Sequence, residues 1–365
     1  MPQPNLLSHH VALLHAALPL ARPTSIIDVG ANPINEAPYS TLLRAGACHV
    51  TGFEPQPEAF AELQRIKGPL ETYHPHAIGD GSTQTLHIYA SGGLTSIFPP
   101  HLPGLAALGR PRWARVLERI ALQTLALDAI PDLAPCDLLK IDIQGGEKLV
   151  FDNATRTLSN AVAVIVELRY MQLYEGEPMA GGVDESLRQQ GFMLHKLMFN
   201  KSQPMPHSQA ARLNRRRTAD QLIDGDAVYL RHPGRIADFT DAQVMHLALL
   251  AAGVFDSHST ALYAVDELVR RGLVPKDVPL HYANALPDSL QARRSRGKQA
   301  QAPQPVEHAP SDAPAQPLAK PEAQSPAKPS VKPKVAASQK PAAKATAAPT
   351  RQSAVSRKAG AQRKA

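Results

Sequence analysis

Short apolar runs recur through the first 232 residues, and helical patterns separate several of them. We expect strands at residues 25–29, 49–54, 71–78, 84–90, 137–142, 161–168, 192–197 and 226–230, and a short strand with a turn within 121–130. We expect helices at residues 5–20, 36–46, 57–67, 148–151 and 184–190. Strands that alternate with helices in this way are typical of an α/β fold with a mainly parallel sheet.

The chain changes character after this part. Two helical patterns at residues 240–253 and 257–272 predict an appended helical hairpin. From Gln291 onward Ala, Pro, Lys, Gln and Ser dominate, and such a composition buries too little apolar area to offset the entropy of ordering. We therefore expect one domain over residues 1–232 that includes an N-terminal helix at 5–20, a helical extension at 233–287, and a disordered basic tail at 288–365.

Charge divides the chain at the same place. Residues 291–365 contain 15 Lys or Arg and 3 Asp or Glu, a net charge of +12. Residues 1–290 contain 24 Lys or Arg and 29 Asp or Glu, a net charge of −5. The tail is either a solubilising extension or a non-specific contact with nucleic acid, another anionic polymer or a membrane surface. It lacks interleaved aromatic residues, so base stacking is not expected.

The two cysteines, Cys48 and Cys136, lie far apart and predict neither a disulfide framework nor a zinc cluster. This usage fits a reducing cytoplasm. No apolar run reaches the length of a membrane span. Residues 11–18 resemble the core of a signal peptide, but His9 and His10 replace the usual basic residues before it, so we interpret this stretch as a packing helix.

The stretch Asp28-Val29-Gly30-Ala31-Asn32 ends the first predicted strand with an acid and a glycine turn, and Glu54 ends the second strand. This arrangement is typical of a nucleotide-type cofactor site, in which Glu54 accepts hydrogen bonds from ribose hydroxyls. The Gly-x-Gly-x-x-Gly pattern of dinucleotide sites is absent, which favours an adenosine ligand such as S-adenosylmethionine. Gly79 and Asp80 follow the third strand and either approach the adenine or form a simple turn.

Three carboxylates are candidates for acid–base chemistry. Asp142 ends a buried strand, at the sheet edge where open α/β sheets bind ligands. Glu147 starts the next helix and either takes part in the chemistry or caps that helix. Glu167 interrupts an apolar strand, where a charge is costly unless it is used or is paired, for example with Arg169 or Lys140.

We expect no bound metal. His74 and His76 share one face of a strand, but no carboxylate cluster accompanies them in the sequence. The loop at 91–119 and the basic segment at 201–217 are candidates to line a pocket. The basic segment either recognises an acidic substrate or is a solvated loop.

Taken together, several short runs resemble the FkbM-type family of S-adenosylmethionine-dependent methyltransferases, over roughly residues 20–232. They are Ile27–Asn32, Gly52–Pro55, Ala77–Asp80, Thr95-Ser96, Leu125–Ile130 and Leu138–Glu147. The resemblance implies a Rossmann-like class I methyltransferase sheet of seven strands with the last strand antiparallel.

The resemblance also implies roles for single residues. Asp28, Gly30 and Asn32 line the methionine side of the cofactor, Glu54 takes the ribose, Gly79-Asp80 approach the adenine, and Asp142 faces the methyl transfer site. The chain departs from the family pattern at two places. Pro33-Ile34-Asn35 stands where a glycine is common, and Gln144 stands where an acid is frequent, which removes one possible base.

The function expected from these observations is O-methylation of a hydroxyl on a glycan or a small natural product. The alternative is a non-catalytic binding or scaffold protein with a degenerate cofactor domain and a tail that contacts nucleic acid or other anionic polymers. A nicotinamide dehydrogenase is disfavoured by the missing glycines. The identity of the acceptor and the oligomeric state stay open.

Overall fold

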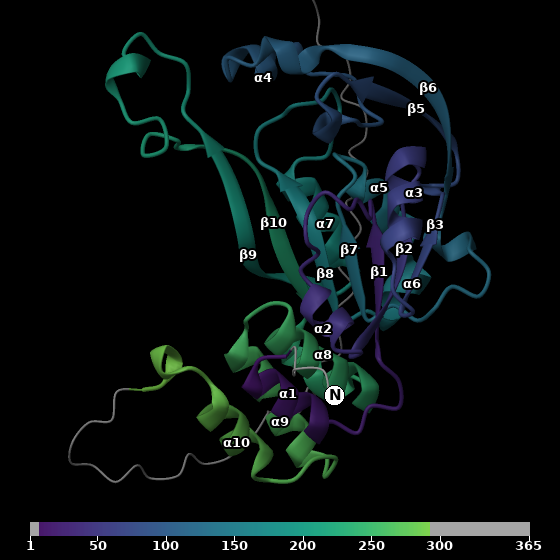
Figure 1. The fold of residues 1–365 in the computed structure, drawn as a ribbon, viewed down its shortest axis with the longest axis vertical. Coiled ribbons are helices and arrows are strands. Elements are labelled where there is room, and N and C mark those ends of the chain that lie inside the picture. Colours follow the sequence, from purple (N-terminus) through teal and green to yellow (C-terminus); the bar gives the residue numbers. More distant parts are fainter. Residues whose placement is uncertain (1–6, 293–365) are drawn as a thin grey trace, which may run out of the picture. The chain divides into compact units, whose positions relative to one another are not determined.

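A computed structural model of the chain describes residues 7–292, in which seven strands form one sheet (Figure 1). The spatial order is β3-β2-β1-β7-β8-β10-β9, and β10 is antiparallel to both of its neighbours. The strands are β1 Thr24–Val29, β2 Cys48–Phe53, β3 Glu71–His74, β7 Leu138–Ile141, β8 Ala163–Arg169, β9 Phe192–Gln203 and β10 Gln221–Arg231. The expected α/β fold, with seven strands and an antiparallel last strand, is confirmed.

A second sheet of three strands has the order β4-β6-β5. Its strands are β4 Ala77–Ile78, β5 Thr83–Tyr89 and β6 Val116–Leu125. The expectation of one continuous strand over residues 71–78 is wrong, because the chain leaves the main sheet after His74. Pro75 lies at the break, and a proline has no N–H to give to a strand ladder.

One face of the main sheet is covered by α5 Glu147–Asp152, α6 Thr155–Asn160 and α7 Ala180–Gln189. Alternate side chains of the central strands point to this face, among them Ile27, Leu139 and Val164. They form a core with Val150, Phe151, Leu158 and Leu187 of the three helices. At the edge of the sheet, α3 Pro57–Ile66 packs through Leu63 on Tyr73 of β3.

The opposite face packs on helices from both ends of the described chain, at the end of the sheet where β1 begins (Figure 1). These are α1 His9–Ala17, α8 Asp241–Gly253, α9 His258–Arg270 and α10 Val278–Ala285. The sheet contributes Ile26, Leu138 and Val228 to this core. The hairpin of α8 and α9 therefore shares a core with the sheet. The helix α10 was not expected from the sequence.

A buried polar cluster joins α8 to the sheet. Asp137 accepts two hydrogen bonds from the guanidinium of Arg22, at 2.6 and 2.9 Å, and one from the backbone N–H of Ser25 at 2.7 Å. His246 of α8 places its Nε2 atom 3.6 Å from the Asp137 carboxylate and its Nδ1 atom 3.0 Å from the hydroxyl of Thr24. The cluster fixes α8 against the amino-terminal edge of the sheet.

The remaining elements are short. They are α2 Ser40–Arg44, α4 Leu102–Ala107, and the 3₁₀ turns η1 Gly92–Leu94, η2 Pro111–Ala114, η3 Leu127–Ala129, η4 Ala210–Arg212, η5 Pro233–Asp238 and η6 Asp288–Leu290. The helix expected over residues 36–46 is reduced to α2, because Pro38 disfavours helical backbone at Ala37 and supplies no N–H. None of the helices in residues 7–292 is both long and apolar enough to cross a membrane. The tail residues 293–365 lie outside the described part of the chain.

Candidate functional site

The turn after β1 is packed tightly between its two neighbouring strands. Gly30 has a φ of +79°, and a Cβ atom at this position would lie 2.1 Å from the carbonyl oxygen of Asp142. Only glycine fits such a position. The N–H groups of Gly30 and Ala31 both donate to the carbonyl of Phe53, at 3.0 and 3.1 Å. The carboxyl ends of β1, β2 and β7 therefore meet at this turn.

Asp28 is buried beneath the turn and has two partners. The hydroxyl of Tyr39 donates to its Oδ2 atom at 2.5 Å, and the ammonium group of Lys140 lies 3.1 Å from its Oδ1 atom. Burial lowers the pKa of Lys140, but Asp28 and Asp142 outweigh that effect and the pKa is raised. Lys140 also lies 3.3 Å from the carbonyl of Gly30, so the pair fixes the first turn.

Asn32 is exposed, and its side chain serves the turn itself. Its Oδ1 atom accepts the N–H of Ile34 at 3.1 Å, and its own N–H donates to Gly30 at 2.8 Å. Such a turn is a usual role of asparagine. The N–H groups at positions 30, 31, 32 and 34 are thus all used within the protein.

Glu54 follows β2 and is buried. One of its oxygens accepts the N–H of Gln56 at 2.8 Å, and its own N–H donates to His74 at 3.1 Å. Burial raises the pKa of Glu54. Its other carboxylate oxygen has no hydrogen-bond partner within residues 7–292, so that oxygen is available to a ligand hydroxyl.

Gly79 and Asp80 lie at the second sheet. The N–H of Gly79 donates to Leu125, and Asp80 accepts hydrogen bonds from the N–H and the hydroxyl of Ser82 at 2.9 and 2.7 Å. These bonds lower the pKa of Asp80. The side chains of Gln84 and Thr124 also lie 3.4 Å from the same carboxylate oxygen, so the contacts of Asp80 are with its own turn and with β5 and β6.

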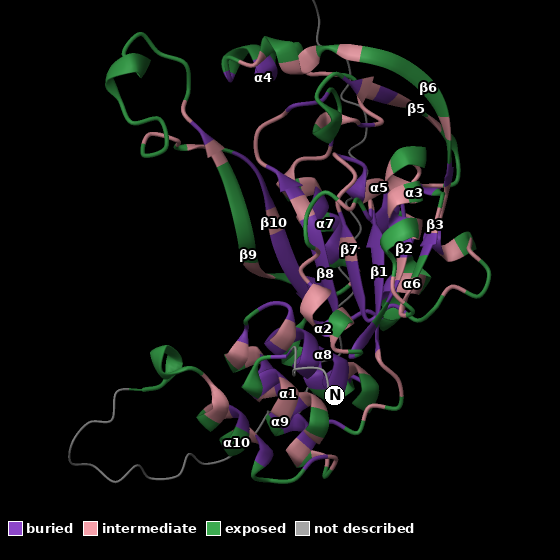
Figure 2. Ribbon diagram, viewed as in Figure 1, coloured by how far each residue is buried: buried purple, intermediate pink, exposed green. Residues whose placement is uncertain are grey.

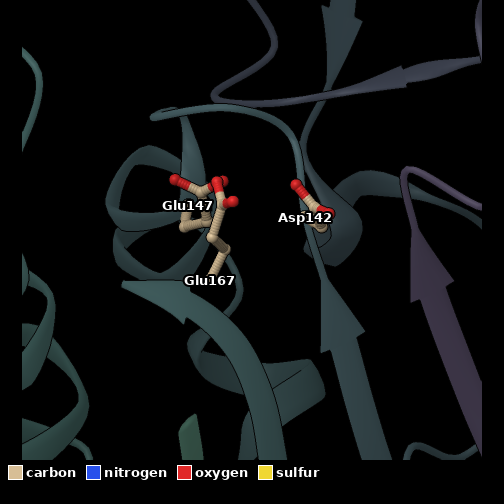
Figure 3. Close-up of side chains that lie close together, drawn as sticks. All are labelled: Asp142, Glu147 and Glu167. Carbon is tan, nitrogen blue, oxygen red and sulfur yellow. The ribbon is translucent and has the colours of Figure 1, made fainter. Parts of the chain in front are cut away.

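The three candidate carboxylates of Asp142, Glu147 and Glu167 come together, and each has an oxygen within 4.8 Å of the others (Figure 3). Glu147 is buried and accepts the N–H of Ile143 at 2.9 Å and that of Gly145 at 3.0 and 3.2 Å. Burial raises its pKa. Its oxygens therefore hold the turn between β7 and α5.

Gln144 lies between the other two carboxylates. Its Nε2 atom donates to Asp142 at 3.0 Å and to Glu167 at 2.9 Å. Its Oε1 atom accepts from Arg169 and from the hydroxyl of Tyr174, both at 3.2 Å. The sequence interpretation treated Gln144 only as a lost base and missed this bridge. No local sequence signal identifies it, because it depends on the neighbouring strand.

Arg169 is buried and pairs with three carboxylates, those of Glu167 at 2.8 Å, Asp224 at 2.9 Å and Glu177 at 3.3 Å. The pairing with Glu167 is the one that the sequence left open, and Lys140 pairs with Asp28 instead. Burial and the charge of Asp142 raise the pKa of Glu167 well above its ordinary value, against the opposing effect of Arg169.

A cavity of about 190 Å³ opens beside this group. It is lined by Glu36, Pro38, Lys140, Ile141, Asp142, Ile165, Met198 and Asp226. Pockets for small molecules generally measure about 300–1,000 Å³, so this cavity accommodates only part of such a ligand. Three of these side chains are acidic and one is basic, and the basic one, Lys140, is paired with Asp28, so the lining favours a ligand with positive charge.

The three clustered carboxylates have a spacing that suits a cation. However, Glu147 is committed to backbone N–H groups and Glu167 to Arg169. The imidazole rings of His74 and His76 stack with centroids 6.3 Å apart. Burial lowers the pKa of His74, and the charge of His76 lowers it further. That no metal binds here stays a prediction.

Residues 28–194 match the family model described as the methyltransferase FkbM domain. A protein of Sinorhizobium fredii (strain NBRC 101917 / NGR234), named 2-O-methyltransferase NoeI, is 28% identical to the chain over 171 residues. That match covers 42% of this chain and 66% of the relative, slightly less than two thirds of its length.

Two solved structures are similar to the chain at lower sequence identity. A putative methyltransferase from Thermoplasma acidophilum has a TM-score of 0.30 and 12% identity, over 58% of this chain and 70% of its own. Sp1610 of Streptococcus pneumoniae, a putative tRNA (m1A22) methyltransferase, has a TM-score of 0.28 and 11% identity, over 76% of this chain and 97% of its own. Similarity at these levels supports no conclusion about activity.

Proposed function

We propose that this chain, whose residues 28–194 match the methyltransferase FkbM domain, transfers a methyl group from S-adenosylmethionine to a hydroxyl oxygen of a glycan or a small natural product. The observation that supports this most directly is the pair of carboxylates, Asp142 and Glu167, held by one amide beside the cavity.

The residues at the carboxyl ends of the strands fit this cofactor. Glu54 has a free carboxylate oxygen for the ribose hydroxyls, and the acidic lining of the cavity suits a sulfonium. Asp28, Gly30 and Asn32 would line the methionine portion of the cofactor. Asp28 would act indirectly, because its contacts with Tyr39 and Lys140 fix the shape of the turn. Gly79 and Asp80 remain our candidates for the adenine side.

When bound, S-adenosylmethionine supplies an electrophilic methyl group. The protein's task is to hold an acceptor hydroxyl in line with that group and to receive its proton. We assign the proton to Asp142, which lines the cavity. Glu167 lies in the same hydrogen-bonded group, and burial raises its pKa, so it is the second carboxylate here that can hold a proton.

Glu147 has a positioning role in this proposal. Its carboxylate fixes the N–H groups of Ile143 and Gly145, and so it fixes the backbone that presents Asp142 and Gln144. We therefore rank Asp142 first, Glu167 second and Glu147 third as the base.

Two measurements test the proposal. Isothermal titration calorimetry should detect binding of S-adenosylmethionine and none of NAD. Transfer of labelled methyl to a panel of hydroxylated acceptors, followed by mass spectrometry, should fall at least about 100-fold in Asp142→Asn. The exposed residue Glu118 offers a matched control, because Glu118→Gln removes an acid that makes no side-chain hydrogen bond in the described chain. Normal cofactor binding with full turnover in Asp142→Asn would reject the assignment of the base.

Absence of binding to either cofactor would favour the scaffold alternative, in which residues 288–365 act on an anionic polymer. Most of that tail lies outside the described residues. Both cysteines are free and buried, and a cytoplasmic location remains a prediction that cell fractionation would test.

A further inference from the structure

Exposed apolar side chains gather in two segments, residues 102–120 and 193–222, which we call the rim. Within residues 7–292 the rim contains 11 of the 15 large apolar side chains that are exposed. They are Leu102, Leu117, Ile120, Met193, Leu194, Leu197, Met198, Phe199, Met205, Leu213 and Leu222. Single exposed apolar residues are ordinary on protein surfaces, whereas a concentration of this kind marks an interaction surface.

The same two segments contain the arginines that have no polar partner in the described residues. Seven arginine side chains in the described part of the chain form no hydrogen bond and no ion pair, and all seven belong to the rim. They are Arg112, Arg115, Arg119, Arg212, Arg215, Arg216 and Arg217. The other arginines there each have a polar partner. The rim therefore presents both apolar groups and uncompensated positive charge.

The two segments approach each other through residues 109–110 and 203–206, at the carboxyl edge of the main sheet. The first residues of β9 lie at the other end of that strand, where Met193 pairs with Leu230 (Figures 1 and 2). The guanidinium of Arg110 donates to the side chain of Gln203 at 2.9 Å. A Cβ atom on Gly109 would lie 2.8 Å from Pro206. Near α4, the N–H of His101 donates to the carbonyl of Leu173, which follows β8. The part of the rim from Phe199 to Leu222 therefore lies at the end of the sheet that carries the candidate site.

This composition decides between two kinds of anionic partner. Single-stranded nucleic acid is usually held by basic residues together with aromatic side chains on which bases stack. In the rim Phe199 is exposed and Trp113 is half-buried, while the other apolar groups are aliphatic. Aliphatic side chains with interspersed arginines suit the surface of a bilayer. There the aliphatic side chains insert into the headgroup region and the arginines bind anionic lipid headgroups.

We propose that the rim is a docking surface for an anionic lipid bilayer. The proposal is independent of methyl transfer, because it concerns binding alone. Leu213 and Met205, on the loop that joins β9 to β10, enter the headgroup region, and Arg215 and Arg216 pair with lipid phosphates.

A local probe tests the surface without interference from the basic tail. Both natural cysteines are buried, so an environment-sensitive fluorophore can be attached to the full chain at Leu213→Cys, with Leu280→Cys as the matched exposed control. Vesicles of phosphatidylglycerol and phosphatidylcholine should shift the emission to the blue at position 213 only. Brominated lipids should quench the probe there and leave position 280 unchanged.

Co-sedimentation with the same vesicles tests charge and apolar contact separately. Arg215→Gln/Arg216→Gln should weaken partitioning about 25-fold, since each arginine near an anionic surface contributes about 5-fold. The control variant Lys67→Gln/Lys276→Gln removes two exposed cations outside the rim. It should change partitioning to the vesicles less than about 2-fold. Met205→Ser/Leu213→Ser should also weaken binding, whereas Ile66→Ser/Leu280→Ser should not.

Three results would overturn the proposal. The first is a probe at position 213 that does not respond to vesicles. The second is a response of that probe to a single-stranded RNA oligomer in place of vesicles, which would make the rim a nucleic-acid surface. The third is equal partitioning of the Met205→Ser/Leu213→Ser variant and its control.

Discussion

The amide nitrogen of Gln144 lies 2.9 Å from the carboxylate of Glu167, and the same nitrogen donates to Asp142 at 3.0 Å. A neutral hydrogen-bond donor between the two carboxylates lowers the electrostatic free energy of holding them close together. In Gln144→Glu, a third carboxylate meets both of them, so their pKa values rise. We expect the acidic limb of the pH profile for kcat to move up by about one pH unit, so that turnover at a pH on that limb falls by up to about 10-fold. Gln144→Met removes the donor without adding charge and serves as the control. An unchanged profile in Gln144→Glu would contradict the role given to this bridge.

Lys140 and Asp28 form a buried ion pair, with Asp28 also bound by Tyr39. In Lys140→Met the Asp28 carboxylate stays buried without its cation, which costs about 3–5 kcal/mol of unfolding free energy. The double variant Lys140→Met/Asp28→Asn removes both charges and should recover a large part of that loss. Urea unfolding of the two variants makes the comparison. A double variant as unstable as Lys140→Met alone would show that the charge of Asp28 is not the cause.

Gly30 and Gly46 have similar backbone conformations and different surroundings. Gly30 has a φ of +79° and faces the Asp142 carbonyl at 2.1 Å, whereas Gly46 has a φ of +74° and nothing within 4 Å of an added Cβ. Gly46→Ala therefore measures the conformational cost alone, about 1–2 kcal/mol. Gly30→Ala adds a backbone clash, so we expect a larger loss of stability and weaker cofactor binding. Thermal unfolding and calorimetry provide the two readouts, and equal losses would mean that the turn relaxes freely.

His246 makes the stability of the α8 contact depend on pH. Burial lowers its pKa below the ordinary value of 6.5, with Asp137 opposing that shift and Arg22 adding to it. A histidine with a lowered folded pKa contributes stability above pH 6.5, and this stability is lost as the pH falls from 6.5 through the folded pKa. The slope that this histidine adds is at most about 1.4 kcal/mol per pH unit.

We therefore expect the unfolding free energy of the wild-type protein to fall more steeply between pH 7.5 and 5.5 than that of His246→Gln. The pKa values of His10, His74 and His195 are also lowered, so a residual slope should remain in the variant. Parallel curves for the two proteins would assign the whole pH dependence to those other histidines.

The sequence was sufficient to place the ends of the central strands. Apolar runs locate β1, β2, β7 and β8, and the carboxyl ends of parallel strands share one edge, so Asp28, Glu54 and Asp142 were expected at that edge. The single strand expected over 71–78 failed at Pro75, and the helix over 36–46 was shortened at Pro38. In both cases a proline outweighed the surrounding pattern.

Other parts of the site depend on distance in space. Gln144, Glu167 and Arg169 are brought together by the pairing of β7 with β8, and Tyr39 reaches Asp28 from a loop without regular structure. The strand β9 extends to Gln203, well beyond the apolar run at 192–197, because its polar half pairs with β10. No pattern within one segment contains these partners.

The shared core of the sheet and α8 affects where the chain can be cut. The family match ends at residue 194, inside β9, and β10 follows it at Gln221–Arg231. A fragment that stops at 194 would leave β8 as an open strand edge with Leu138 and Ile165 uncovered by α8. Such an edge is a template for self-association, so we expect that fragment to aggregate when expressed alone.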